Sequence, residues 1–235
     1  MIDKNLLRQG IEELGLKVTE DRLDLMDLYA QNLVETNKYL NLTRVTDPEK
    51  IVTDHFLDSV AVMTVFFPKK GHKILDIGTG AGFPGVPLAI MNPDCKVTMM
   101  DSTGKKINFV KETCEKLGIT NVSFITGRAE EEAHKNHIRE SFDLTVARAV
   151  SNMKILGEIA IPFVRLGGTF VALKSSDCQD ETQKAVNTIK NMGGKIIKIH
   201  KKIIPVSNIE RSLISIEKIS KTQKKYPRPY GEIVK

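Results

Sequence analysis

The sequence predicts an α/β protein whose sheet is mostly parallel, with an antiparallel edge strand and a helical N-terminal extension. From Lys73 onward, short apolar runs alternate with longer segments of helical periodicity, which is typical of parallel strands covered by helices. Residues 1–68 carry apolar positions at helical spacing ahead of the first strand. Two apolar runs near the C-terminus, 195–204 and 213–219, flank a turn and predict an antiparallel pair at the edge of the sheet.

We therefore expect residues 1–68 to pack as a helical extension on residues 69–235, the α/β domain with a basic C-terminal segment. In the extension, helices are expected at 2–15, from Thr19 or Asp21, and from Asp47 onward. In the domain, strands are expected at 74–77, 97–101, 122–126, 142–147 and 169–173, and helices at 84–91, 104–117, 155–164 and 180–192.

The composition is that of an ordinary folded protein. The chain has 235 residues, 41% of them hydrophobic, and its longest apolar stretch is about half of a membrane span. Its start lacks the apolar segment of a signal peptide. The cysteines Cys95, Cys114 and Cys178 form no CxxC pair and no metal-ligand spacing. These features predict a cytoplasmic protein with buried thiols, bound to neither membrane nor metal.

The most informative stretch runs from Lys73 to Gly85, where an apolar strand opens into four glycines and then into a helix. Strand, glycine loop and helix together let a ligand lie against bare backbone at the end of a parallel strand. The spacing of Gly80, Gly82 and Gly85 also satisfies the dinucleotide fingerprint, but a lone match of this kind is weak.

Asp76 argues against a dinucleotide. It stands two residues before the first glycine, Gly78, so its carboxylate is expected to face the loop and to repel a pyrophosphate. A ligand with a cationic end suits it better, such as S-adenosylmethionine with its sulfonium and α-amino groups. The plainer alternative is a glycine-rich turn with a helix-capping aspartate nearby.

Asp101 stands at the tip of the second predicted strand, where the ribose of a nucleoside ligand is expected. Its carboxylate can accept hydrogen bonds from both ribose hydroxyls, with Ser102 beside it. A pattern in chain order is more specific for a ligand class than any one of its parts: Asp76 comes first, then the glycines including Gly80, then Asp101. At these residues the chain resembles class I S-adenosylmethionine-dependent methyltransferases.

Other strand ends add polar residues to the same crevice. Gly127–Glu130 would bring backbone amides and a carboxylate to the edge of an adenine. Arg148 and Lys174 also stand at strand ends, either to position ligands or as plain surface ion-pair partners. His55, Asp58 and Ser59 share one helical region, but we interpret the histidine as satisfied by its helix neighbours, since no nucleophile elbow accompanies it.

The net charge of +6 is unevenly distributed. Residues 184–235 contain 13 Lys and Arg against 3 Glu, a net charge of +10, which leaves −4 for the rest of the chain. A basic end on a mildly acidic body is typical of a protein with a polyanionic partner. The alternative is a solvated segment that only keeps the protein soluble.

Two missing motifs narrow the range of atoms that could accept the methyl group. The [Asn/Asp]-Pro-Pro-aromatic motif of amine methylases is missing after the fourth strand, where Ala147–Val150 stands, and no cysteine falls where a carbon-5 pyrimidine enzyme needs its nucleophile. An acceptor with its own lone pair, such as guanine N7, fits best.

Six motifs in chain order then make the resemblance close. They are Asn41–Thr43, His55–Ser59, Asp76–Gly85, Gly127–Glu130, Ala147–Val150 and Lys225–Arg228. Together they resemble the bacterial small-subunit ribosomal RNA guanine-N7 methyltransferase family, also called glucose-inhibited division protein B (RsmG), over nearly the whole chain.

The resemblance implies a seven-stranded class I methyltransferase fold that methylates a guanine in 16S ribosomal RNA, free or in its ribonucleoprotein. It implies S-adenosylmethionine contacts at Gly78, Phe83, Ala129, Glu130 and Arg148. For the RNA we expect contacts from Lys174, Lys221, Lys224, Lys225 and Arg228. Three alternatives stay open: an NAD-dependent oxidoreductase, a small-molecule methyltransferase, and an RNA-binding assembly factor without catalysis. The chain departs from the family's usual pattern after Arg228, where a further basic-proline stretch is expected.

Overall fold

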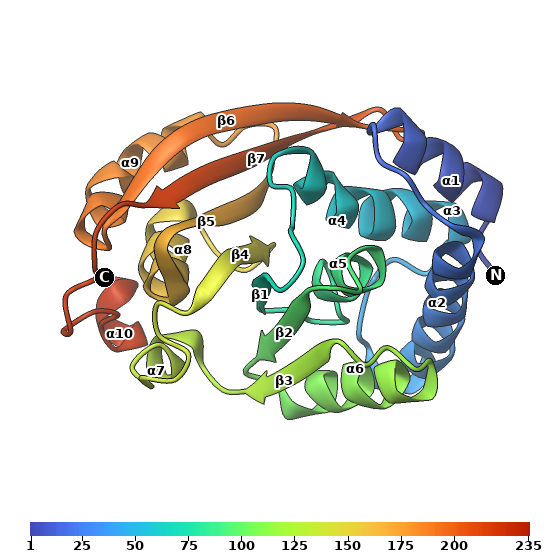
Figure 1. The fold of residues 1–235 in the computed structure, drawn as a ribbon, viewed down its shortest axis with the longest axis horizontal. Coiled ribbons are helices and arrows are strands. Elements are labelled where there is room, and N and C mark those ends of the chain that lie inside the picture. The colour runs from blue at the N-terminus through green and yellow to red at the C-terminus, as the bar shows by residue number, and fades with distance from the viewer.

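All 235 residues are described by a computed structural model, which contains one seven-stranded sheet in the order β3-β2-β1-β4-β5-β7-β6 (Figure 1). The strands are β1 (Lys73–Ile77), β2 (Lys96–Asp101), β3 (Val122–Thr126), β4 (Phe142–Arg148), β5 (Val164–Ser175), β6 (Gly194–Ile204) and β7 (Ile209–Lys218). The predicted strands are confirmed, although β5 begins five residues before the predicted start at 169.

The helices of the N-terminal part are α1 (Lys4–Glu13), α2 (Glu20–Leu40), α3 (Pro48–Lys50), a π-helical turn (Ile51–Leu57), α4 (Asp58–Val60) and a 3₁₀ turn (Ala61–Thr64). Those that follow are α5 (Gly85–Met91), α6 (Gly104–Lys116), α7 (Ala129–Glu132), α8 (Met153–Ala160), a 3₁₀ turn (Ile161–Phe163), α9 (Gln179–Asn191) and α10 (Tyr230–Ile233). As predicted, Asp47 caps α3, because its Oδ1 accepts the backbone N–H of Lys50 at 2.9 Å.

Strands β1 to β5 are parallel, whereas β7 pairs antiparallel with both β5 and β6. The sheet is therefore mostly parallel, as predicted. The predicted antiparallel pair at the edge of the sheet is confirmed, with β6 as the outermost strand and β7 between β6 and β5. A crossover through α9 makes β6 parallel to β5, and the hairpin turn then inserts β7 between them.

The edge strand β6 has a mixed outer surface. Lys195, Lys198 and Lys201 are exposed along it, and they alternate with the exposed apolar side chains Ile197 and Ile203. A bulge interrupts the pairing with β7 between Ile196 and Lys198. Much of the basic charge of the C-terminal part of the chain therefore lies on this edge.

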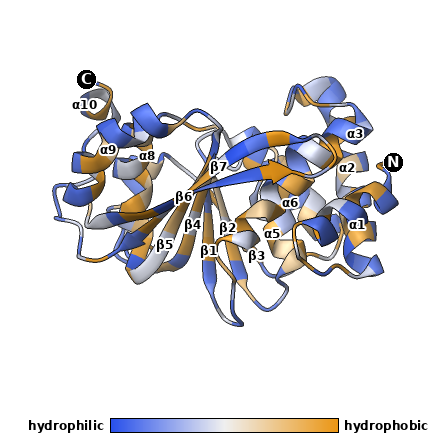
Figure 2. Cartoon of the chain, turned by 90° about the horizontal axis from the view of Figure 1, so that it is seen from above, coloured by the Kyte–Doolittle hydropathy of each residue, from blue (hydrophilic) through white to orange (hydrophobic).

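Helices cover both faces of the sheet, with α8 and α9 on one side and α1, α2, α5 and α6 on the other (Figure 2). Each face has its own apolar core. The larger core joins side chains of residues 2–63 to those of β1, β2, α5 and α6. Because they share this core, the N-terminal helices lie directly against the α/β domain. None of the helices has the length and apolarity needed to cross a bilayer.

Candidate functional site

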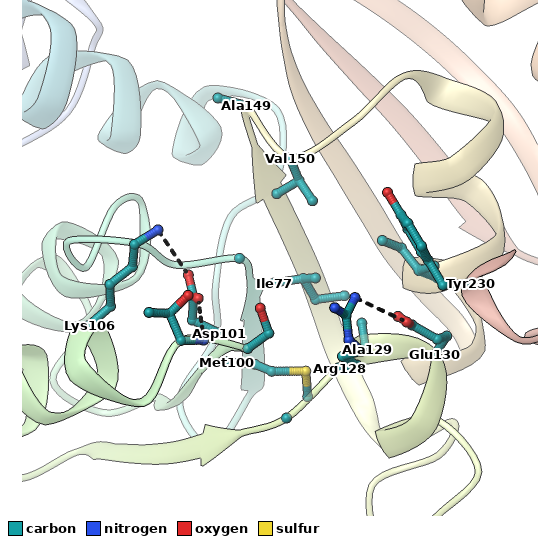
Figure 3. A pocket seen from close by; sticks show the side chains of 15 residues that line it. Ile77, Met100, Asp101, Lys106, Arg128, Ala129, Glu130, Ala149, Val150 and Tyr230 are labelled. Atoms are coloured by element: carbon teal, nitrogen blue, oxygen red, sulfur yellow. Dashed lines mark hydrogen bonds and ion pairs between the residues drawn. The ribbon is translucent and has the colours of Figure 1, made fainter. Parts of the chain in front are cut away.

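A cavity of about 310 Å³ opens where the parallel strands end (Figure 3). Its walls come from four consecutive strand ends and from the C-terminal turn: Ile77–Gly78, Met100–Thr103, Gly127–Glu130, Ala149–Val150 and Tyr230. This is the place where ligands bind in open α/β sheets. Of the nine residues predicted to bind a cofactor, five line the cavity: Gly78, Asp101, Ser102, Ala129 and Glu130.

The glycine loop needs its glycines for steric reasons. Gly78 and Gly82 have φ angles of 70° and 88°, a region that other residues rarely adopt. A Cβ on Gly78 would lie 2.6 Å from Cγ2 of Val150, and one on Gly82 would lie 2.3 Å from the hydroxyl of Tyr29. That hydroxyl donates to the carbonyl of Ala81 at 2.8 Å, so α2 holds the loop from outside.

Asp101 lies in the cavity wall and also fixes its shape. Its Oδ2 accepts the N–H of Gly80 at 3.0 Å, and its Oδ1 accepts the N–H of Thr103 at 2.8 Å. Nζ of Lys106 stands 4.0 Å from the same carboxylate. Because a carboxylate has about four lone-pair sites, Asp101 keeps capacity for two hydroxyl donors from a ligand. Gly80 acts through this contact and does not itself line the cavity.

Glu130 provides an acceptor without a partner. The residue is 7% exposed, and its Oε1 accepts no hydrogen bond. Nη1 of Arg128 lies 3.8 Å from Oε1, within ion-pair range but beyond a hydrogen bond. Buried polar atoms in native proteins are almost always bonded, so an open acceptor in a cavity wall indicates a ligand with a donor group, such as the amino group of an adenine.

The Asp76 carboxylate faces the glycine loop, as predicted, but it contacts the loop from the buried side. It is 0% exposed and does not line the cavity, because its Oδ2 accepts the N–H of Gly85 at 2.8 Å. Its Oδ1 has no hydrogen-bond partner. Burial raises the pKa of this carboxyl to about 6. Asp76 thus joins the end of β1 to the start of α5 and supports the glycine loop from below.

Phe83 and Arg148, two further predicted cofactor contacts, also lie behind the cavity wall. The Phe83 ring stacks on the ring of His55 with centroids 4.4 Å apart, and the Arg148 guanidinium lies 5.5 Å from the Phe83 centroid. Arg148 donates to Oδ2 of Asp58 at 3.0 Å and to the carbonyl of Asp54. That carbonyl belongs to the π-helical turn, so Arg148 ties the end of β4 to the N-terminal helices.

Both ring nitrogens of His55 have partners, but apart from the Asp54 carbonyl, 3.2 Å from Nδ1, these are not the helix neighbours that the sequence predicted. Its Nε2 lies 3.0 Å from the hydroxyl of Thr43, and its Nδ1 lies 3.2 Å from Nη2 of Arg148. Burial, and then the charge of Arg148, lowers the pKa of His55 to about 4, so its ring is neutral at pH 7. The hydroxyl of Ser59 donates to the backbone carbonyl of His55 instead of its ring, which excludes a hydrolase triad.

Lys174 supports the loop that follows β4. Its Nζ donates to the carbonyl of Ser151 at 3.0 Å and pairs with Oε1 of Glu181 at 2.9 Å. Oε2 of Glu181 accepts the N–H of Met153 at 3.0 Å. The loop carries Val150, which forms part of the cavity wall, so Lys174 acts on the cavity through the backbone and has no free charge for a phosphate.

Comparison with known proteins identifies the family to which the chain belongs. The sequence model of the family described as GidB, rRNA small subunit methyltransferase G, matches residues 22–214. A relative named ribosomal RNA small subunit methyltransferase G in Lachnoclostridium phytofermentans is 40% identical over 235 residues, which is 100% of this chain and 97% of its own. The chain belongs to this family.

Other comparisons agree with that membership. A methyltransferase G relative in Clostridium perfringens is 39% identical over 98% of this chain and 97% of its own length. Among solved structures, a SAM-dependent methyltransferase from Aquifex aeolicus has a TM-score of 0.54 at 18% identity, over 74% of this chain and 94% of its own. YcgJ of Bacillus subtilis also has a TM-score of 0.54, at 14% identity over 71% of this chain and 100% of its own. At these identities the two structures show the fold alone, that of class I S-adenosylmethionine-dependent methyltransferases.

In this member of the methyltransferase G family, the basic C-terminal residues divide into two groups. Lys221, Lys224 and Lys225 are exposed and form no ion pair. Arg228, predicted to contact RNA, instead pairs with the buried Glu158, since its Nη2 and Nε lie 2.7 and 2.9 Å from the two carboxylate oxygens. The Arg228 side chain is 37% exposed, but its guanidinium is already paired with a carboxylate, which argues against the predicted RNA contact.

Several residues that line the cavity were not predicted from the sequence, namely Thr103, Lys106, Val150, Ile159 and Tyr230. Thr103 and Lys106 follow Asp101 closely and could have been found from the helix start at Gly104. Tyr230 gives no such signal, because 100 residues separate it from Glu130 and only the folded chain brings the two to one cavity. No group of three or more His, Cys, Asp or Glu side chains is arranged to hold a metal ion.

Proposed function

We propose that this protein transfers the methyl group of S-adenosylmethionine to N7 of a guanine in 16S ribosomal RNA. The full-length relatives bear the name ribosomal RNA small subunit methyltransferase G. The observation that carries the cofactor assignment is the cavity at the strand ends, whose two buried carboxylates, Asp101 and Glu130, both present acceptors to a ligand.

The cavity fits the adenosine part of this cofactor. Asp101 has lone pairs left for the two ribose hydroxyls, and the unpartnered Oε1 of Glu130 can accept the adenine amino group. Gly78 leaves bare backbone at the floor, where a Cβ would collide with Val150.

When bound, S-adenosylmethionine supplies an electrophilic methyl group, and the sulfur keeps the electron pair of the broken bond. Guanine N7 has a free lone pair, so no proton has to leave before the new bond forms. The chain's task is then to align the two partners and exclude water. Neutral His55 lies behind the cavity and no histidine lines it, so a general base near neutral pH is absent from the walls.

Arg148 and Lys174 act as positioning residues in this proposal. Arg148 fixes the end of β4 against Asp58, and Lys174 fixes the carbonyl of Ser151 three residues later. Ala149 and Val150 lie between Arg148 and Ser151, and they line the cavity next to Gly78. Neither cation reaches the cavity, so their effect on the reaction is through the position of this loop.

The RNA partner is supported by charge. Lys221, Lys224 and Lys225 form an exposed group of unpaired cations, which suits phosphate contacts. The proposed substrate is the small-subunit RNA or its ribonucleoprotein, and the reaction would take place in the cytoplasm.

Two measurements test the proposal. Small-subunit RNA from cells lacking the gene should lose one 7-methylguanine, detected by borohydride–aniline cleavage, and the wild-type gene should restore it. Calorimetry with the purified protein should show binding of S-adenosylhomocysteine and none of NADH. A methyl group lost from another atom would refute the acceptor, and binding of NADH alone would refute the cofactor. Cofactor binding without any lost methyl group would favour the non-catalytic assembly factor.

A further inference from the structure

The last residues of the chain are docked on the protein body by several specific contacts. Arg139 donates to the carbonyls of Thr222 at 3.1 Å, Gln223 at 3.2 Å and Tyr226 at 3.0 Å. The same guanidinium donates to the carbonyl of Ala133 at 2.8 Å. One half-buried cation thus joins the C-terminal segment to the turn that follows α7.

Two further contacts continue this docking toward the cavity. Nε2 of His134 lies 2.9 Å from the carbonyl of Pro227. The backbone N–H of Arg228 donates to Oε1 of Glu158 at 2.9 Å, in addition to its side-chain ion pair. Ile233, in α10, is only 1% exposed and belongs to the core under α8. These contacts hold α10 in one place.

That place is the rim of the cavity. Tyr230 opens α10 and lines the cavity beside Arg128 and Glu130 (Figure 3). The Arg128 guanidinium lies 5.7 Å from the centroid of the Tyr230 ring, within cation–π range. Figure 3 shows Asp101 and Lys106 at one end of the cavity, and Arg128, Glu130 and Tyr230 at the other.

We propose that Tyr230 is a cofactor-binding residue, and that the C-terminal turn supplies an aromatic wall for the adenine of S-adenosylmethionine. This inference rests on the proposed function. It places the binding site for the adenine of S-adenosylmethionine at the C-terminal end of the chain. The adenine would contact the Tyr230 ring while its amino group donates to Glu130, whose Oε1 has no other partner.

An RNA base is the competing occupant of this wall, since an aromatic ring stacks on any base. The chemistry of the neighbours favours the adenine of the cofactor. Tyr230 and the buried acceptor of Glu130 line the same cavity as Asp101, the ribose acceptor. A phosphate-bearing nucleotide of an RNA strand would bring negative charge close to both carboxylates, whereas adenosine itself is neutral.

The test compares tyrosine variants in the full-length protein by calorimetry with S-adenosylhomocysteine. Tyr230→Ala and Tyr230→Leu remove the π face and should weaken binding about 5- to 150-fold, the usual range for a base stacked on an aromatic ring. Tyr230→Phe keeps the ring and should stay within about threefold of the wild type. Tyr39→Ala is the matched control, because Tyr39 is also exposed, at 68%, and lies outside the cavity.

The outcomes separate three cases. Melting temperatures without ligand should be similar in all variants, since Tyr230 is 43% exposed and little packing is lost. Unchanged affinity of both Tyr230→Ala and Tyr230→Leu, with normal binding by the wild type, would overturn the inference and leave the proposed function intact. So would a selective loss of affinity for small-subunit RNA. Failure of the wild type to bind S-adenosylhomocysteine would overturn the proposed function itself.

Discussion

Replacing Asp76 with Asn should make the stability of the protein depend less on pH. In the folded chain the pKa of Asp76 is raised from 3.8 to about 6, because the carboxyl is fully buried. A raised carboxyl pKa means that the folded state binds the proton more tightly than the unfolded state. The wild type is therefore relatively more stable in acid, and it loses this contribution as the pH rises through about 6.

The size of the effect follows from the shift. About two pKa units at 1.36 kcal/mol each give about 3 kcal/mol, lost mainly between pH 4 and 6.5. An asparagine stays neutral throughout, and its side-chain oxygen can still accept the N–H of Gly85. The unfolded carboxyl is already partly ionised at pH 4, so Asp76→Asn should gain about 2.5 kcal/mol relative to the wild type on going from pH 4 to pH 7.5, or roughly 5–10 °C in melting temperature.

Thermal melts of both proteins across this pH range measure the difference directly. Asp143→Asn is a control of opposite sign. Partial burial raises the pKa of Asp143, but hydrogen bonds from the N–H of Lys73 and from the Arg165 guanidinium lower it by more. The pKa of Asp143 in the folded chain is therefore below its ordinary value. Its stabilising contribution is present above its unfolded pKa and is lost in acid, so Asp143→Asn should cost stability at neutral pH only. A melting-temperature difference for Asp76→Asn that does not change with pH would refute the reasoning.

Three further predictions follow from other contacts. Gly78→Ala should weaken binding of S-adenosylhomocysteine at least about tenfold and lower the free energy of unfolding by about 1 kcal/mol, because its φ is 70° and its Cβ would meet Val150; unchanged calorimetry would show that the loop can relax. Replacing Lys221, Lys224 and Lys225 with Ala should reduce the slope of log K for RNA binding against log salt concentration by about 2–3, while Arg228→Ala leaves this slope nearly unchanged. A clear fall in the slope for Arg228→Ala would mean that Arg228 is free to contact phosphate. Arg148→Lys should lower the free energy of unfolding by about 2 kcal/mol in urea titrations, since a lysine cannot reach Asp58, His55 and the Asp54 carbonyl together; a loss below about 0.5 kcal/mol would contradict the role of the guanidinium.

The sequence predicted the parts of this site that depend on local pattern. Asp101 ends a strand that the apolar run defines and Ser102 comes directly after it, while Ala129 and Glu130 follow the next strand. Because parallel strands end at one edge of the sheet, all four had to come close together. The fold class follows from the same regularity, whereas the order of the strands was not predicted.

The errors come from contacts that the pattern leaves undetermined. Whether Asp76 faces a ligand depends on which donor reaches it first, and the N–H of Gly85 already does. Arg228 finds Glu158 across 70 residues of sequence, so its charge could not be assigned from the C-terminal segment alone. Tyr230 reached the cavity only because Arg139, His134 and Glu158 hold the segment there.

The lysines of β6 have a consequence for self-association. An outer strand of 11 residues offers unpaired backbone groups to any other extended chain, and its exposed Ile197 and Ile203 would add apolar contacts to such a pairing. Lys195, Lys198 and Lys201 would bring like charges together if two copies met edge to edge, and the bulge at Ile197 breaks the register that a new strand needs. Part of the basic charge on this chain thus protects the sheet from aggregation, independently of any nucleic acid.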